Sequence, residues 1–483
     1  MPRQDREHRD AGQSDHRRPR EHARRRRVIQ AFGDKLSELS ERYVPEPFVL
    51  AVLLTVLTLV LAAVFGEAVA ELSFPERLEA LADGWFGAFY GTGLMKFALQ
   101  MVIVLVTGHA LALSKPVRSA IERFAGVAKT PGAAVVVVSL VACAASLIQW
   151  GLGAIAGAFM AREMGRAFAK RGQPVHYPLL GAAGYAGFLV WHGGFSGSAP
   201  LKVAEEGHFL ADAVGVIPIS ETLLGTLNIT VIGTLLVLIP LLFWRLMPRD
   251  ADKMVQYPLD SFEEADAEST DLPPPKTAVE VLERTRLLNL VIGGLLVGVL
   301  VYYFAEKGIG GWNLDSINLL FLTLGILLHP SPSSYVNAIV DGVKGAAGII
   351  LQFPFYFGIL GLLEASGLIE QIAQFFVDIS NADTFPIFTF LSAGIVNFFV
   401  PSGGGQWAVQ GPVIMQAVDT LGVPPQQAIM ALAYGDAWTN MLQPFWALPL
   451  LGIMGLRAKD IIGYTGFVML VTGPVMMLLL YLF

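Results

Sequence analysis

The 483-residue sequence has few charged residues and almost no cysteine. Charged residues make up 15% of the chain, whereas about 25% is usual for soluble globular domains. The single cysteine, Cys143, excludes an intramolecular disulfide and a cysteine-rich metal site. The GxxxxGK-S/T nucleotide loop and the HExxH metalloprotease motif are also missing, so neither ATP hydrolysis nor zinc proteolysis is expected, and we predict that the chain is not an enzyme.

Long apolar runs are abundant instead. Hydrophobic residues form 54% of the chain, and the mean hydropathy is +0.56. Several runs reach the roughly 20 residues needed to cross a bilayer, which predicts an all-α polytopic membrane protein. Crossing segments are expected near 47–65, 90–113, 131–160 as a pair, 176–192, 220–247, 287–304, 314–328, 346–366, 384–412 as a pair, 427–452 and 463–483.

Two polar stretches are predicted to lie outside the membrane. Residues 1–43 begin with a strongly basic segment, but no apolar core follows it directly, as a secretory signal would require. We expect a disordered cytoplasmic tail that attracts anionic lipid, with no nucleic-acid partner. Residues 248–285 are acidic and contain the sequence DLPPPK, which is typical of a cytoplasmic linker.

Lys and Arg are unevenly distributed among the predicted loops. With the N-terminus inside, and leaving aside the basic tail and the loop at 248–285, the inside loops carry eleven of them and the outside loops three, as the positive-inside rule requires. This count holds only if 131–160 and 384–412 each cross the membrane an even number of times. Each is therefore expected to be a helical hairpin or a broken helix, and the C-terminus is expected outside.

The two halves of the chain align without gaps at an offset of 251 residues, which places Ser146 on Asn397 and Gly153 on Gly404. One helix between the halves adds a single crossing, so the second half is predicted to be inverted, as in many secondary transporters. The predicted units are a first repeat at 44–247, the cytoplasmic linker at 248–285, a linker helix at 286–306 and a second repeat at 307–483.

The clearest helix break is the sequence VPSGGGQWAVQGP at 400–412. Irregular backbone at membrane depth is tolerated only where it is buried in protein or lines a water-filled cavity. Free N–H groups after Ser402 would lie at a helix N-terminus and could hold the oxygens of an anion, and glycine would let the ligand approach closely. The alternative is a glycine-rich packing motif between helices.

This sequence and WHGGFSGSAPL at 191–201 together resemble the bacterial short-chain fatty acid transporter family, of the acetoacetate/butyrate permease type. The resemblance covers residues 44–483 and departs at Gln149, where the family has Asn before Trp-Gly. It implies a secondary carrier of short-chain monocarboxylates in the bacterial inner membrane, without a cofactor and driven by a co-transported proton or sodium ion. A carrier of another organic anion, such as a dicarboxylate, and a channel are the alternatives. Because carriers with similar hairpins are often dimers, a homodimer is the candidate assembly.

Such a substrate needs hydrogen-bond donors for its carboxylate and a small apolar wall for its tail. The predicted substrate-binding residues come from the two breaks and from the motif that begins at residue 191. Packing alone is the alternative for each tryptophan. The residues are Ser402, Gly403, Gly404, Gly405, Gln406, Trp407, Trp150, Gly151, Trp191 and His192.

A second group of polar residues is predicted to couple transport to an ion. Asp436, Thr439 and Asn440 are spaced so that they share one helix face. An acid inside the membrane is costly unless it is paired, hydrated or functional. Asn397 and Ser146 precede the two breaks and complete the predicted ion-coupling group. A fixed hydrogen-bonding anchor is the alternative role of Asp436.

Overall fold

The computed structural model of the chain describes residues 42, 45–206, 208, 210–258, 277–308, 314–399 and 402–483. These residues form helices and connecting segments without any strand, which confirms the all-α prediction. Six of the helices are long and apolar enough to cross a membrane, or up to seven if a bent pair counts as one span. The predicted tail at 1–43, apart from residue 42, lies outside the described residues, as do residues 259–276 of the linker.

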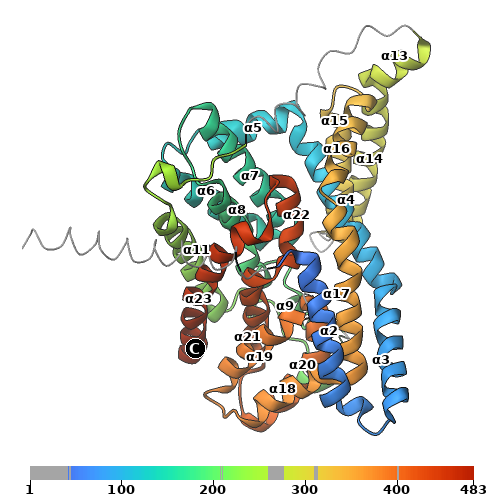
Figure 1. Ribbon diagram of the computed structural model, residues 1–483, viewed down its shortest axis with the longest axis vertical. Coiled ribbons are helices and arrows are strands. Elements are labelled where there is room, and N and C mark those ends of the chain that lie inside the picture. The colour runs from blue at the N-terminus through green and yellow to red at the C-terminus, as the bar shows by residue number, and fades with distance from the viewer. Residues whose placement is uncertain are drawn as a thin grey trace, which may run out of the picture.

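One set of helices forms an outer framework (Figure 1). Within it, α17 packs on α2 and α3, while α4 packs on α15 and α16. Helices α3 and α4 follow each other, and the segments Phe74–Lys96 and Ala98–Leu113 meet at a bend of 42°. The framework helices are α2 (Pro47–Phe65), α3 (Phe74–Phe89), α4 (Thr92–Leu113), α14 (Arg286–Lys307), α15 (Leu314–Leu328), α16 (Pro332–Lys344) and α17 (Ala347–Ser366).

A second set forms the hairpin group, in which α6 packs on α7 and α19 packs on α21. Helices from both halves of the chain mix here, because α11 and α8 each pack on α23. The members are α6 (Pro131–Ile148), α7 (Trp150–Lys170), α8 (Tyr177–Tyr185), α11 (Thr226–Leu246), α19 (Phe385–Phe399), α20 (Gly403–Leu421), α21 (Pro425–Thr439), α22 (Pro444–Met454) and α23 (Ala458–Leu482).

Shorter helices connect these two sets. The five short α-helices of the described residues, together with α3 and α16, lie where the apolar pattern predicts only loops, because their mixed polar and apolar residues form no long apolar run. The short α-helices are α5 (Lys115–Ala125), α9 (Ser198–Lys202), α10 (Ala211–Val214), α13 (Ala278–Arg284) and α18 (Leu368–Asp378). The 3-10 helices are η1 (Glu67–Val69), η2 (Ala186–Leu189), η3 (Trp191–Gly193), η4 (Ala251–Lys253) and η6 (Asn440–Leu442).

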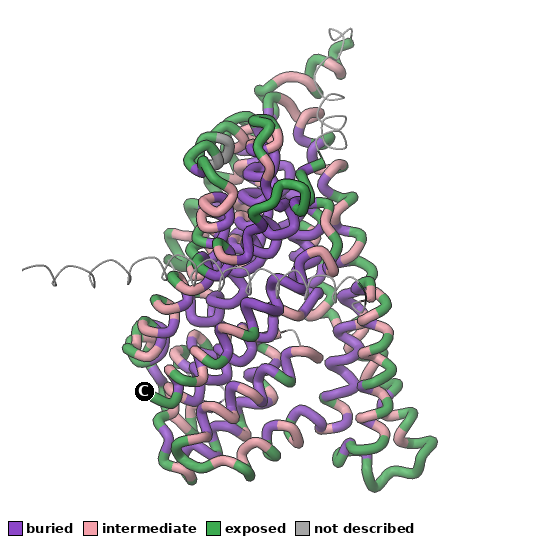
Figure 2. The backbone as a smooth tube through the Cα atoms, turned by 60° about the vertical axis from the view of Figure 1, so that its left-hand side comes forward, coloured by how far each residue is buried: buried purple, intermediate pink, exposed green. Residues whose placement is uncertain are grey.

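Burial distinguishes the helices at the edge of the molecule from those in its interior (Figure 2). Only 17% of the apolar window is buried in α2 and in α14, against 61% in α17. Leu53 of α2 and Val301 of α14 are 56% and 64% exposed. Because this apolar surface suits lipid rather than water, α2 and α14 face the bilayer, while the hairpin group provides the buried interior.

Candidate functional site

Both hairpins break at a residue whose side chain caps the next helix. The Gln149 side-chain oxygen accepts a hydrogen bond from the Leu152 N–H at 2.7 Å, at the start of α7. The Ser402 hydroxyl accepts one from the Gly405 N–H at 3.3 Å, at the start of α20. The caps satisfy one free N–H of each new helix, so the chain can restart a helix inside the hairpin. Gln149, where the sequence departs from the family pattern, is therefore a helix cap.

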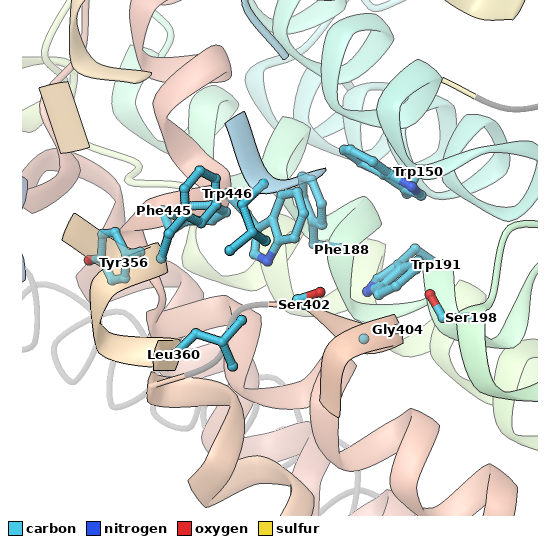
Figure 3. A pocket seen from close by; sticks show the side chains of 13 residues that line it. Trp150, Phe188, Trp191, Ser198, Tyr356, Leu360, Ser402, Gly404, Phe445 and Trp446 are labelled. Atoms are coloured by element: carbon cyan, nitrogen blue, oxygen red, sulfur yellow. The ribbon is translucent and has the colours of Figure 1, made fainter. Parts of the chain in front are cut away.

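A cavity of about 310 Å³ lies between the framework and the hairpin group. Figure 3 shows Ser198 and Gly404 on one side of it and Tyr356 and Phe445 on the other. Residues from both halves of the chain line it: Leu94, Trp150, Phe188, Trp191, Ser198, Tyr356, Phe357, Leu360, Ser402, Gly403, Gly404, Phe445 and Trp446.

One end of this cavity is rich in hydrogen-bond donors. The first backbone bond of α20 runs from the Gln406 N–H to the Ser402 carbonyl at 2.8 Å. The N–H groups of Gly403 and Gly404, which precede it, therefore have no acceptor within the helix. The indole N–H of Trp191 is buried and has no hydrogen-bond partner among the described residues. Together with the Ser198 and Ser402 hydroxyls, these groups can surround one carboxylate.

The cavity carries no formal charge. None of the 13 described residues that line it is a Lys, Arg, His, Asp or Glu. An anion here would be held by neutral donors and by the partial positive charge at the N-terminus of α20. Most of the remaining lining is aromatic, so the cavity has one polar end and a large apolar wall.

A buried histidine–aspartate pair lies directly behind the polar end. Nδ1 of His192 is 2.6 Å from Oδ2 of Asp436, and the two side chains are 0% and 1% exposed. Nε2 of His192 accepts a hydrogen bond from the Ala199 N–H at 3.2 Å. Nε2 therefore carries no proton, and Nδ1–H donates to the Asp436 carboxylate.

Gly403 links the cavity to this pair. A Cβ atom on Gly403 would come within 2.7 Å of Cε1 of His192 and within 2.9 Å of the Trp191 ring. The Trp191 and His192 rings also stack, with centroids 4.3 Å apart. The start of α20 therefore packs directly on the two rings. Because the interior is closely packed, a movement of the rings would displace the start of α20, and a movement of α20 would displace the rings.

Asn397 organises the remaining polar groups near Asp436. Its Nδ2 atom lies 2.9 Å from the Asp436 carbonyl, 3.0 Å from the Thr439 hydroxyl and 2.8 Å from Oδ1 of Asn440. Oδ1 of Asn397 is buried and has no partner among the described residues. An unpaired buried oxygen costs about 1–3 kcal/mol, so this atom is a candidate ligand for a cation.

The structure brings most of the predicted residues together. Ser402, Gly403, Gly404, Trp150 and Trp191 line the cavity. His192, Asp436, Asn397, Thr439 and Asn440 form the hydrogen-bonded cluster behind it.

Five predicted residues lie elsewhere. Gln406 points into the hairpin, where its Nε2 donates to the Ala393 carbonyl and to Gln410. Trp407 is 1% exposed and packs in an apolar cluster away from the cavity. The Gly405 N–H is used by the Ser402 cap. Gly151 lies in the first turn of α7 and Ser146 packs between Gly153 and Gly187, and neither lines the cavity.

Several lining residues were not predicted. Phe445 and Trp446 follow Gln443 and Pro444, where α21 and α22 are separated by η6, so the break itself was an available signal. Tyr356, Phe357 and Leu360 lie within α17. Nothing in the local sequence separates these residues from other apolar residues of a membrane helix.

A multi-pass helical membrane protein in which broken helices from two halves meet at a buried cavity has the architecture of a membrane transporter. Comparisons with known proteins define it further. Residues 28–483 match the family described as "Short chain fatty acid transporter". The chain belongs to this short-chain fatty acid transporter family.

Two relatives carry the name "Putative short-chain fatty acid transporter". The Escherichia coli K12 protein is 40% identical, with 94% of this chain and 100% of the relative covered. The Haemophilus influenzae protein is 37% identical, with the same two shares covered. Among solved structures, the Alcanivorax borkumensis YdaH transporter is 15% identical, with 90% of this chain and 98% of that chain covered and a TM-score of 0.39.

Proposed function

We propose that this protein is a secondary carrier that moves short-chain monocarboxylates, such as butyrate and acetoacetate, across the bacterial inner membrane. The main observation is the uncharged cavity with donors at one end and aromatic rings at the other. The carboxylate would bind the N–H groups of Gly403 and Gly404, the Trp191 indole and the two serine hydroxyls. The short alkyl chain would lie against the aromatic wall.

The lack of a cationic side chain among the described lining residues disfavours a dicarboxylate, the alternative substrate. A second carboxylate inside the membrane would need a cation beside it. Lys96, the cation that the sequence offers, is 66% exposed at its side chain and pairs with Asp315 of α15 at 3.2 Å. It does not line the cavity. One carboxylate is therefore the substrate charge that this site accommodates.

A co-transported proton or sodium ion would balance that charge. The buried Asp436 side chain accepts a hydrogen bond from Nδ1–H of His192. Oδ1 of Asn397, which has no partner among the described residues, belongs to the same cluster. A cation bound there would lower the cost of the buried negative charge. Because Gly403 packs on His192, occupation of this cluster would favour the α20 position that binds substrate.

The loop charges also support a cytoplasmic N-terminus, an outside C-terminus and two inverted repeats. The order hairpin, helix and short 3-10 break occurs twice, first in α6, α7, α8 and η2 and then in α19, α20, α21 and η6. In both halves the capped hairpin tip comes before the broken helix. This order is what two related halves would produce.

Competition between substrates tests this function. Labelled butyrate uptake would be measured with unlabelled butyrate, acetoacetate and succinate as competitors, in wild type, Ser402→Ala and Ser198→Ala. Both variants should raise the KM for butyrate, because each removes a donor to the carboxylate. Ser380→Ala is the matched control, since its hydroxyl donates to the Val377 carbonyl of its own turn at 2.8 Å. Wild-type KM in both site variants would show that the cavity is not the binding site.

A further inference from the structure

The apolar end of the cavity is centred on one indole ring. Trp446 stacks on Phe188 with centroids 5.5 Å apart and meets Trp150 edge-on at 5.0 Å. It also meets Phe445 edge-on at 5.1 Å. Phe445 in turn meets Tyr356 of the framework at 5.0 Å. The rings form a continuous wall across both halves of the chain, and Trp446 occupies its middle.

Trp446 is held in place by the start of its helix. Pro444 begins α22, and Gln443 accepts a hydrogen bond from the Phe445 N–H at 3.3 Å. The Gln443 amide also donates to the Phe398 carbonyl of α19 at 2.8 Å. On its other side, Phe445 stacks on Phe353 with centroids 3.9 Å apart. This end of the cavity is therefore fixed by contacts on several sides and has little room to move.

We infer that Trp446 sets the longest acyl chain that the carrier accepts. The inference rests on the proposed function, in which the carboxylate lies at the Ser198 and Gly404 end. The alkyl chain then points toward Trp446 and Phe445, which lie away from Ser198 and Gly404 in Figure 3. Each added methylene gains apolar contact until the chain reaches the indole. A further methylene then requires the wall to move, which is costly in a packed interior.

This predicts a characteristic dependence on chain length. Each methylene that the cavity accommodates should improve affinity by about fourfold, the equivalent of about 0.8 kcal/mol per buried methylene. For acids longer than the longest chain that fits, affinity should fall rather than level off. Replacing the indole by a smaller side chain should move the optimum by about two carbons toward longer acids, because space opens where the chain ends.

The test measures competition of unlabelled straight-chain acids, from acetate to octanoate, against labelled butyrate uptake. The readout is the inhibitory concentration of each acid relative to that of butyrate. This ratio does not depend on how much folded protein a variant yields. Trp446→Leu removes the indole ring altogether, and Trp446→Phe keeps an aromatic group if the larger change prevents folding. The control is Trp244→Phe, which changes a 37% exposed tryptophan of α11.

The expected result is a shift toward longer acids in Trp446→Leu, a smaller shift in Trp446→Phe and none in Trp244→Phe. If wild type takes up butyrate but both Trp446 variants keep the wild-type profile, the chain-length inference is wrong while the proposed function stands. If wild type neither takes up nor binds any short-chain monocarboxylate, the proposed function itself fails.

Discussion

Two neighbouring glycines at the start of α20 should differ in how the same added methyl group affects the stability of the protein. Gly404 faces the cavity, and a Cβ atom there would lie 3.9 Å from Cβ and Oγ of Ser198, an ordinary contact. A Cβ atom on Gly403 would lie 2.7 Å from His192 and 2.9 Å from Trp191, closer than side chains pack. Gly404→Ala should therefore fold, whereas Gly403→Ala should disturb both rings.

Gly404→Ala should change the stability of the protein and its KM for butyrate through two separate effects. Alanine in place of glycine stabilises a helix by about 0.4–1 kcal/mol, chiefly by restricting the unfolded chain. The methyl group, however, occupies the space in which a carboxylate would approach the backbone N–H. Losing one hydrogen bond to a charged group costs about 1.5–3 kcal/mol, so the KM for butyrate should rise by roughly tenfold to one hundredfold.

The assay pairs the thermal stability of purified protein with butyrate uptake. Gly404→Ala should keep or raise the Tm while uptake weakens, and Gly403→Ala should lose both. Gly298→Ala in α14 is the matched control, because nothing lies within 4 Å of its added Cβ, so uptake should stay at the wild-type level. Wild-type KM in a stable Gly404→Ala protein would refute the placement of the carboxylate at the start of α20.

Three further substitutions test other parts of the account. Trp191→Phe keeps a ring on His192 but removes the indole N–H, so butyrate KM should rise by about tenfold without loss of Tm; an unchanged KM would exclude the indole as a donor. Asp436→Asn should abolish gradient-driven accumulation while exchange of internal for external butyrate continues, and retained accumulation would remove Asp436 from coupling. Lys96→Gln should leave butyrate KM unchanged and alter stability by less than about 1 kcal/mol, because its pair with Asp315 is exposed; a large rise in KM would place Lys96 at the substrate.

Much of the fold could be predicted because the membrane imposes strong rules on the chain. Apolar runs mark the long helices, and a glycine-rich break inside a run marks a hairpin. The pair predicted at 384–412 corresponds to α19 (Phe385–Phe399) and α20 (Gly403–Leu421). Helices such as α16 and α18 were missed because their polar residues interrupt the apolar pattern. The division into inverted repeats stays a prediction.

The candidate site was predictable only beside the breaks. Trp191 and Ser402 were found because they flank irregular backbone. Gln406 and Trp407 follow Ser402 by four and five positions, but residues of one helix point in different directions, and neither of these two lines the cavity. Trp446 and the framework residues lie far away in the chain, so only the packing of the helices brings them to the cavity.

The His192–Asp436 pair shows a further limit of the sequence. The two residues are 244 positions apart, and the repeat offset of 251 places His192 on Gln443 instead. His192 was a candidate because it follows Trp191 in the motif at 191–201, and Asp436 because it is an acid in a predicted membrane segment. Their contact depends on how η3 packs against α21, which no local pattern in the sequence reports.

Labelled butyrate uptake into proteoliposomes that contain the purified full chain tests the central claim most directly. Proton and sodium gradients would be imposed separately, with acetoacetate and succinate as competitors. The account predicts accumulation of butyrate driven by one of the two gradients, inhibited by acetoacetate and not by succinate. Transport of succinate without butyrate uptake under either gradient would contradict it and favour the dicarboxylate alternative.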